Sequence, residues 1–239
     1  MTTQTISGIR EHMIIGGQPV DQSQGERIPV YNPATGQVIA QQPEAGTQGV
    51  DLAVKAAHQA LTESEWATML PAQRERLLLK LADLLEANAD EMAQLETANN
   101  GKLLSISYGL EVYSGAQWLR YMAGWATKVS GDVLNVSIPF PPKTGYHAYT
   151  RLEPVGVVAA IVPWNFPLLM AIWKMAPALA AGCTVVLKPA EETPLTAIRL
   201  AELALEAGIP AGVFNVITGR GESTGAALTA HPLLTSSPA

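Results

Sequence analysis

The second half of the sequence alternates short apolar runs with helical segments, and this pattern limits the possible folds more than any other feature. A continuous apolar run such as Val155–Val162 is typical of a strand buried on both faces of a parallel sheet. The repeated order of strand and helix predicts a doubly wound α/β sheet, of which three strands are visible. The expected strands are Val155–Val162, Thr184–Leu187 and Val213–Ile217; the expected helices are 167–181, 194–207 and a third that begins near Glu222.

The first half of the sequence places short strands and then helices before this alternation. Turn-forming residues predict short strands over residues 13–40. Apolar positions at helical spacing predict a helix over Val50–Leu61. Pro71 suits the first turn of a second helix. A third helix is expected to end at the glycine C-cap Gly101, and a fourth to cover residues 105–129.

Two further strands, Val133–Ile138 and Tyr146–Glu153, are joined by the stiff segment Pro139–Pro142. A two-stranded ribbon is marginally stable by itself. We therefore expect the ribbon to pair with a later part of the chain or with another subunit. The predicted fold class is α/β: a partial doubly wound, Rossmann-like parallel sheet with N-terminal helices and a two-stranded oligomerisation ribbon.

Composition and charge exclude several classes of partner. Hydrophobic residues make up 48% of the chain and charged residues 15%, which fits a well-buried globular protein and not a disordered one. The net charge is −6 and Lys and Arg form no run, so we expect no nucleic-acid partner and no membrane partner. The single Cys183 and the absence of a signal-peptide pattern favour the cytoplasm. The four histidines show no metal-ligand spacing, so no metal site is expected.

The segment Pro163–Pro167 lies where the first parallel strand ends and the next helix begins. Such sheets bind ligands in the crevice at the carboxyl ends of their strands. Asn165 therefore projects an amide donor next to unpaired backbone N–H groups and the positive end of a helix dipole. Donors in that position stabilise an oxygen that becomes negative. The alternative is that Asn165 serves only as the helix N-cap.

The ends of the next two strands carry other candidates for a ligand site. Glu191 could accept hydrogen bonds from ribose hydroxyls, and Lys188 could bind a hydroxyl or a phosphate. The alternative is a carboxylate at a helix start beside an exposed lysine. Gly219, Gly221 and Gly225 resemble a dinucleotide fingerprint, but the spacing G-x-G-x-x-x-G and the place after the third strand weaken it. A turn that packs a helix on the sheet explains these glycines equally well.

An apolar stripe runs along the helix that follows Asn165. Phe166, Met170 and Trp173 fall at i, i+4 and i+7, on one helix face. Such a stripe is normally part of the core. Lys174 is either a buried charge near the site or an exposed lysine.

Three long motifs resemble the aldehyde dehydrogenase superfamily. They are Glu153–Pro167 (EPVGVVAAIVPWNFP), Pro177–Pro194 (PALAAGCTVVLKPAEETP) and Glu206–Val216 (EAGIPAGVFNV). The resemblance runs from about Met13 to His231 and includes Tyr31–Gly36 and the segment Leu95–Lys102. An ordinary short-chain dehydrogenase is less consistent with the sequence, because a first-strand glycine fingerprint and a Tyr-x-x-x-Lys pair are missing.

The resemblance implies a role for each candidate residue. Asn165 would be the oxyanion donor, and Glu191 with Lys188 would hold the adenosine ribose. A 2′-phosphate would meet the charge of Glu191, so NAD is expected in preference to NADP. Residues implied at the cofactor are Ile161, Pro163, Trp164, Lys188, Glu191, Gly219, Gly221 and Gly225; those implied on the wall of the aldehyde tunnel are Phe166, Met170 and Trp173.

The implied activity is the NAD-dependent oxidation of an aldehyde to a carboxylic acid. An aromatic and thioether wall suits an apolar or arylalkyl aldehyde, and a homo-oligomer is expected. Residues 1–132 and 155–239 would form parts of the NAD-binding domain, and residues 133–154 the oligomerisation arm. Cys183 lies at a structural position, so the catalytic cysteine and general-base glutamate are expected beyond residue 239. The segment Leu234–Ala239 departs from the family pattern and suggests a truncated end. The alternative function is a non-catalytic fragment that binds nucleotide or co-assembles with intact subunits.

Overall fold

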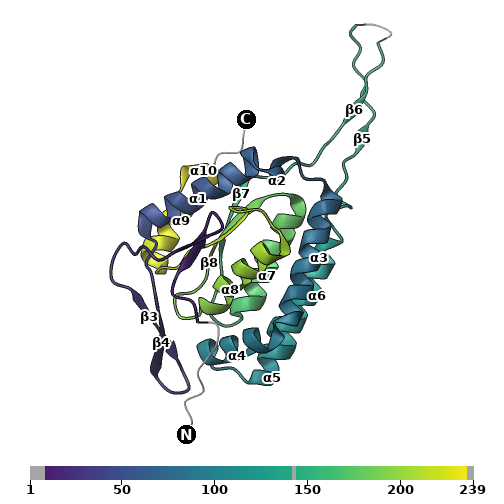
Figure 1. Cartoon of the computed structure of the whole chain (residues 1–239). Helices are drawn as coiled ribbons and strands as arrows, with labels where there is room; N and C mark the ends of the chain where they lie inside the picture. The colour runs from purple at the N-terminus through teal and green to yellow at the C-terminus, as the bar shows by residue number, and fades with distance from the viewer. Residues whose placement is uncertain (1–8, 142–143, 236–239) are drawn as a thin grey trace.

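The computed structural model describes residues 9–141 and 144–235, and its main sheet has five strands in the order β2-β1-β9-β8-β7 (Figure 1). Strands β7, β8 and β9 are parallel, whereas β1 runs antiparallel to β9 and to β2. The expected parallel strands are confirmed, and an N-terminal hairpin extends their sheet. The bounds are β1 (Met13–Ile15), β2 (Gln18–Val20), β7 (Val157–Ile161), β8 (Thr184–Lys188) and β9 (Phe214–Val216).

The remaining elements surround this sheet. A separate hairpin comprises β3 (Ile28–Asn32) and β4 (Gln37–Gln42). The longer helices are α1 (Gly46–Glu63), α3 (Pro71–Ala87), α4 (Ala89–Asn100), α6 (Ser114–Ala123), α7 (Pro167–Ala181) and α8 (Leu195–Ala207). The short ones are α2 (Glu65–Thr68), α5 (Leu104–Ile106), α9 (Ala226–Thr229) and α10 (Pro232–Thr235), with the π-helices η1 (Ser107–Tyr113) and η2 (Gly221–Gly225).

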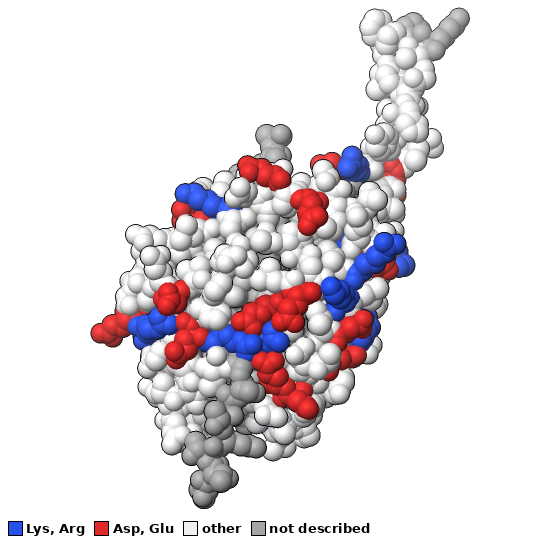
Figure 2. All heavy atoms as spheres, viewed as in Figure 1, with Lys and Arg blue, Asp and Glu red and all other residues white. Residues whose placement is uncertain are grey.

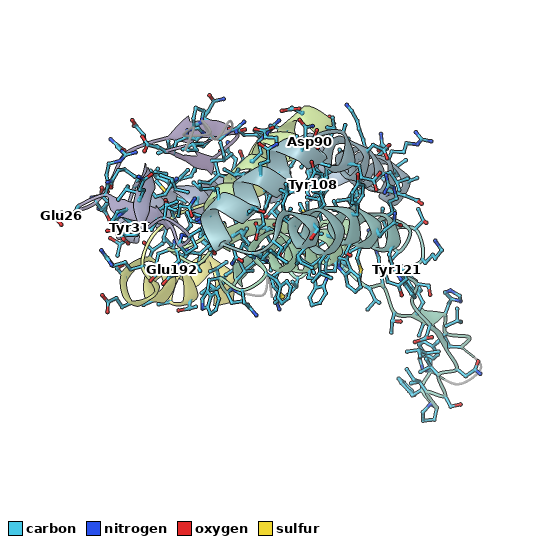
Figure 3. All side chains as sticks on the ribbon, turned by 90° about the horizontal axis from the view of Figure 1, so that it is seen from below. Glu26, Tyr31, Asp90, Tyr108, Tyr121 and Glu192 are labelled. Carbon is cyan, nitrogen blue, oxygen red and sulfur yellow. The ribbon has the colours of Figure 1, made fainter. Side chains whose placement is uncertain are left out.

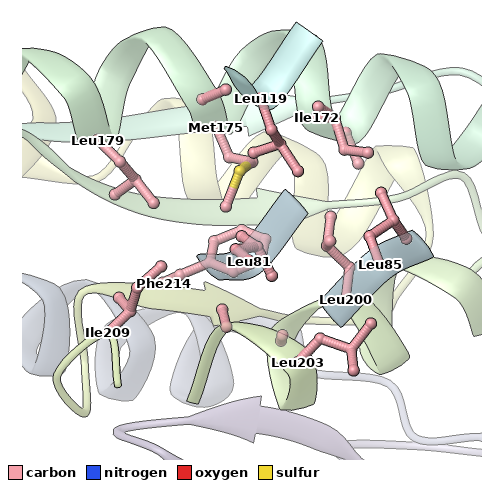
Figure 4. Close-up of a cluster of buried hydrophobic side chains, with 14 of the residues drawn as sticks. Leu81, Leu85, Leu119, Ile172, Met175, Leu179, Leu200, Leu203, Ile209 and Phe214 are labelled. Atoms are coloured by element: carbon pink, nitrogen blue, oxygen red, sulfur yellow. The ribbon is translucent and has the colours of Figure 1, made fainter. Parts of the chain in front are cut away.

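Helices cover both faces of the sheet, as a doubly wound fold requires. In β8, Val185 and Leu187 belong to the cluster formed with α3, α6, α7 and α8, whereas Val186 belongs to the cluster formed with α1. This alternation follows from the two-residue period of a strand. Figure 4 shows the first cluster, with side chains such as Leu81 of α3, Leu119 of α6 and Met175 of α7 meeting over the sheet.

The expectation that the first parallel strand is buried on both faces is wrong in part. Val158 and Ala159 of β7 are half-buried, and Ile161 is 43% exposed. Within the part of the chain that the structure describes, β7 pairs with β8 alone, so it is an edge strand. The fully buried strand is β8, which has a neighbour on each side.

The fourth expected helix, residues 105–129, is shorter and less regular than the periodicity predicts. The α-helix ends at Ala123, and its beginning is replaced by the π-helix η1. A π-helix has a wider turn than an α-helix and often occurs at functional sites. The buried residues of η1 are Ser107, Glu111 and Val112.

The predicted ribbon forms, but its strands are shorter than Val133–Ile138 and Tyr146–Glu153. Only β5 (Val133–Leu134) and β6 (Ala148–Tyr149) pair, because no third strand supports the ribbon in the described part of the chain. The ribbon projects away from the body of the molecule (Figure 1). Pro142, the end of its predicted connection, lies outside the described residues, as do residues 236–239 of the departing tail.

Candidate ligand site at the carboxyl edge of the sheet

Three loops meet at the carboxyl edge of the parallel strands. One runs from β7 through Pro163–Phe166 to α7, the second follows Lys188 at the end of β8, and the third follows β9 and contains η2. Backbone hydrogen bonds hold the loop starts together: Val162 N–H donates to the Lys188 carbonyl (3.1 Å), and Ile217 N–H to the Leu187 carbonyl (3.0 Å). The sheet therefore brings the predicted site residues to one edge, as its parallel topology requires.

The Asn165 side chain is exposed, and the structure does not support the N-cap alternative. Residue Phe166 is the N-cap of α7, it makes no side-chain cap hydrogen bond, and Pro167 occupies the first helical turn. Two polar side chains instead hold the backbone of this loop. Asn100 Nδ2 donates to the Trp164 carbonyl (2.6 Å), and Lys102 Nζ donates to the Asn165 carbonyl (3.1 Å).

The expectation that Asn165 lies beside unpaired backbone N–H groups is wrong for one of them. Leu169 N–H, in the first turn of α7, donates to Glu111 Oε2 at 2.8 Å. Glu111 is fully buried in η1 and also binds the ammonium of Lys102. A carboxylate from another element thus caps this helix, where the dipole favours negative charge.

Glu96 completes a buried acidic cluster around Lys102. Its Oε2 accepts a hydrogen bond from Thr196 Oγ1 (2.7 Å), and its Oε1 lies 3.3 Å from Lys102 Nζ without hydrogen-bond geometry. Burial, together with the charge of Glu111, raises the pKa of Glu96 to about 7, although Thr196 and Lys102 oppose the shift. Sequence reasoning missed this cluster, although Glu96 and Lys102 both lie in a segment that carries the resemblance.

Lys188 is buried, so the alternative of an exposed lysine is wrong. Only 2% of its side chain is exposed, and its ammonium donates to the carbonyls of Pro189 and Gly219 (both 2.8 Å) and to Glu191 Oε2 (3.3 Å). These contacts use all three N–H donors of the ammonium.

Glu191 is more open, with 31% of its side chain exposed. Its partial burial works to raise the pKa of the carboxyl. Hydrogen bonds from its own backbone N–H and that of Gly221, together with Lys188, outweigh burial and lower the pKa. Glu191 is therefore ionised and available to a ligand near neutral pH.

The three glycines differ in what surrounds them. At Gly219 (φ +151°), an added Cβ would lie 2.0 Å from Thr224 Oγ1 and 2.7 Å from Glu44 Oε1, so this glycine is required by packing within the chain. At Gly225 the nearest atom would be Lys188 Cε at 3.6 Å, an ordinary contact. At Gly221 nothing lies within 4 Å, which leaves room for a ligand.

Glu44, a second residue that sequence reasoning missed, orders this glycine loop. Its carboxylate is buried and accepts hydrogen bonds from Ser223 Oγ (2.8 Å), Thr224 Oγ1 (2.5 Å) and the Arg220 N–H (3.1 Å). Nothing in the local sequence pattern singles out Glu44, because it lies just before α1, far along the chain from Gly219–Gly225.

The stripe on α7 is not simply part of the core. Trp173 is 42% exposed, and Phe166 and Met170 are half-buried. Trp173 packs against Trp118 of α6, with ring centroids 5.7 Å apart, and Trp118 against Tyr121 at 5.6 Å. Trp173, Trp118 and Tyr121 therefore form an open aromatic surface on α7 and α6, the helix α7 being the one that follows the Asn165 loop. Lys174 is exposed, as one of its two alternatives predicted.

The cavity next to Glu191 has a volume of about 560 Å³. Its lining includes Trp164, which is 60% exposed, and Asn100, together with Tyr31 and Glu192, which Figure 3 shows at the same end of the molecule. Ile161 and Pro163, the other predicted cofactor residues, are exposed at the end of β7. A larger cavity of about 840 Å³ lies at the base of the ribbon, away from the carboxyl edge.

Cys183 lies away from the candidate site and is buried, with 3% of its surface exposed. It precedes β8, so it stands at the amino end of the strand, and its carbonyl accepts a hydrogen bond from Trp66 Nε1 (3.2 Å). In residues 9–141 and 144–235, His, Cys, Asp and Glu form no group that could hold a metal ion. No helix in those ranges is both long and apolar enough to cross a bilayer.

Comparison with known proteins gives a consistent result. The pattern that defines the aldehyde dehydrogenase family matches residues 20–236. Phenylacetaldehyde dehydrogenase of Pseudomonas fluorescens is 59% identical over 229 residues, which are 95% of this chain and 46% of that protein. Aldehyde dehydrogenase 1A1 of Homo sapiens is 47% identical over 212 residues, or 88% of this chain and 41% of that protein.

Solved structures agree with the sequence matches. The NAD+ complex of an aldehyde dehydrogenase from Bacillus cereus has a TM-score of 0.88 at 44% identity, covering 97% of this chain and 46% of its own. PnpE in complex with nicotinamide adenine dinucleotide has a TM-score of 0.89 at 44% identity, and the match covers 95% of this chain and 45% of PnpE. The chain thus spans less than half the length of these relatives.

Proposed function

Because the chain belongs to the aldehyde dehydrogenase family, we propose that it carries the NAD-binding and oxyanion-stabilising part of an enzyme that oxidises an aldehyde to a carboxylate. The observation that carries this proposal is the meeting of Asn165, Glu191 and Gly221 at the carboxyl edge of one parallel sheet. The thiol nucleophile and the general base are proposed to lie beyond residue 239, because the chain spans under half of its relatives.

The cofactor side of the proposal rests on Glu191 and the space around it. When bound, NAD supplies the acceptor for the hydride. Glu191 is ionised and partly exposed, as a carboxylate that accepts two ribose hydroxyls must be. Gly221 offers open space, and Trp164 an exposed ring, on the same edge. The fixed charge of Glu191 favours NAD over NADP, because a 2′-phosphate would be repelled.

The substrate side of the proposal rests on Asn165 and the aromatic surface next to it. The exposed Asn165 amide is free to donate to an oxygen that gains negative charge. Phe166, Met170 and Trp173 offer an aromatic and thioether surface on the adjoining helix, and we propose an apolar or arylalkyl aldehyde as substrate. The 59% identical relative, a phenylacetaldehyde dehydrogenase, supports this class.

A fusion of this chain to the C-terminal half of that relative would test the function. We expect the fusion to form NADH from phenylacetaldehyde, and Asn165→Ala to lower kcat by about 10²–10³ while NAD binds as before. If the kcat of Asn165→Ala stayed within threefold of the parent fusion, the assignment of Asn165 as oxyanion donor would be wrong.

A second candidate is a non-catalytic fragment that binds nucleotide or co-assembles with intact subunits. The ribbon favours it, because its exposed apolar side chains, such as Val133 (73%) and Tyr149 (65%), suit a contact with another subunit. We propose that residues 133–154 form an oligomerisation arm, and that residues 1–132 and 155–239 belong to one NAD-binding domain. The one cysteine of the sequence supports a reducing, cytoplasmic compartment.

The unfused chain tests what the two candidates share, whereas activity of the fusion favours the first. We expect it to bind NAD and to form no NADH from phenylacetaldehyde, because Cys183 is buried at the wrong end of β8. NADH formation that disappears in Cys183→Ala would show that this cysteine is the nucleophile after all.

A further inference from the structure

The Asn165 loop is exposed, yet its backbone is held by one partly buried cation, Lys102. Lys102 Nζ donates to the Asn165 carbonyl at 3.1 Å and lies 4.8 Å from the centre of the Phe166 ring, within the range of a cation–π contact. The Lys102 side chain is only 12% exposed. A single ammonium thus contacts both residues that join the end of the loop to helix α7.

The same ammonium is fixed by acidic side chains of two other elements. It binds the carboxylate of Glu111 in η1 and lies 3.3 Å from Glu96 Oε1 in α4. Glu111 in turn accepts the Leu169 N–H of α7 at 2.8 Å. Lys102 and Glu111 therefore hold the loop and the start of its helix as one unit.

We propose that Lys102, supported by Glu111 and Glu96, is a positioning residue that fixes the Asn165–Phe166 peptide and so presents the Asn165 amide to the substrate oxygen. This inference rests on the proposed role of Asn165. A donor that is fixed before the reaction needs no reorganisation when charge develops, which is the source of its effect on rate. Lys102 binds the Asn165 backbone carbonyl, and we propose no contact between Lys102 and the substrate.

The 239-residue chain itself allows a direct test by NMR relaxation. The Phe166 amide reports on the peptide that carries the Asn165 carbonyl. In the parent we expect an order parameter of about 0.85, as in rigid backbone, and in Lys102→Met a value below about 0.6. Lys102→Arg keeps a charged donor and should restore order. Lys55→Met, at an exposed lysine of α1, is the matched control.

If Lys102→Met fails to fold because two buried acids lose their cation, the double variant Lys102→Met with Glu96→Gln removes one acid together with it. A folded variant without Lys102 whose Phe166 amide stays as ordered as in the parent overturns the proposal.

The fusion to the C-terminal half then separates the two proposals. We expect Lys102→Met to lower kcat at least tenfold, to leave the KM for NAD within twofold, and to be rescued by Lys102→Arg. A loop that loses order while kcat stays unchanged overturns the proposal that this order serves the reaction, and Asn165→Ala in the same fusion tests the oxyanion role separately.

Discussion

The Lys188 ammonium has three N–H donors, and contacts within the chain engage all of them. At the scale of residues, these contacts make Lys188 less available to bind a ligand hydroxyl or phosphate than the sequence predicted. A ligand can reach the ammonium only in exchange for one of its present acceptors, and the longest contact, 3.3 Å to Glu191, is the weakest. On the proposed function, we therefore expect the choice between cofactors to depend mainly on Glu191.

We expect Glu191→Gln to weaken NAD binding by about 10- to 100-fold, because charge-assisted hydrogen bonds are worth roughly 1.5–3 kcal/mol. NADP should gain relative to NAD, since the repelling charge is removed. The measurement is the ratio of the two dissociation constants by calorimetry on the chain. Glu65→Gln, at an exposed glutamate of α2 outside the candidate site, is the control. An unchanged ratio would place Glu191 away from the ribose.

Glu96 predicts a specific pH dependence of stability. Its pKa is about 7 in the folded chain against an ordinary value of 4.5. Between these pH values the folded state keeps a proton that the unfolded state has released. The free energy of unfolding should therefore fall as the pH rises from about 4.5 to about 7, and this contribution is constant above pH 7.

Glu96→Gln should remove that part of the pH dependence. Relative to the parent, the variant should gain up to about 3 kcal/mol between pH 5 and pH 8. Urea unfolding at several pH values measures the difference, and Glu26→Gln, at an exposed glutamate, is the control. Parallel pH curves for parent and Glu96→Gln would show that Glu96 is ionised throughout.

At the scale of elements, the glycine loop is built around a buried carboxylate from another part of the chain. Gly219→Ala would bring a Cβ against Thr224 and Glu44 in a backbone region that only glycine tolerates well. We expect it to lower the free energy of unfolding by about 1–3 kcal/mol, measured in urea.

Gly221→Ala is the matched comparison in the same loop. Nothing lies near its Cβ position, so stability should change by less than about 0.5 kcal/mol. NAD binding should weaken instead, if the cofactor approaches here. Equal losses of stability in both variants would contradict the distinction between a packing glycine and a ligand-facing glycine.

Elements that depend on local patterns could be predicted from the sequence. Helices α3 and α4 follow from Pro71, their apolar spacing and the cap at Gly101, which has φ +85°. The strands β8 and β9 follow from their apolar runs. The π-helix η1 could not be predicted, because its buried Glu111 pairs with residues outside its own segment. The edge position of β7 in the described sheet could not be predicted either, because an apolar run does not show how many neighbouring strands pair with it.

In the candidate site, too, some residues could be predicted from local patterns and others could not. Lys188 ends β8, and Asn165 and Glu191 lie in the loops that follow β7 and β8, so topology alone brings them to one edge. Glu44 and Glu111 act across 180 and 58 positions of the sequence, on Thr224 and Leu169. Local sequence patterns do not indicate which residues are in contact at such separations.

At the scale of the whole molecule, the ribbon stands apart from the charged body. Beyond its base, its described residues are free of Lys, Arg, Asp and Glu (Figure 2). Phe140 (77% exposed) and Tyr149 (65%) are among the most exposed apolar side chains of the described chain. A surface of this kind favours contact with another apolar surface.

We expect the combined substitution Val133→Lys and Tyr149→Lys to dissociate the chain into monomers, because charge on both strands opposes burial in an interface. Sedimentation velocity of parent and variant measures the change. Val38→Lys, at a 47% exposed position in the β3–β4 hairpin, should leave the parent assembly intact. A parent that sediments as a monomer would exclude assembly through this ribbon under the conditions used.

The Lys102 cluster also limits how this protein can change during evolution. Loss of the lysine alone would leave Glu96 and Glu111 buried without their shared cation, and loss of Glu111 alone would take one acidic partner from Lys102 and the acceptor from the Leu169 N–H of α7. We therefore expect single replacements that remove one of these charges to be selected against, and compensated sets to be tolerated. Across the lineages of the family, positions 96, 102 and 111 should covary, and a member without the lysine should also have exchanged an acid.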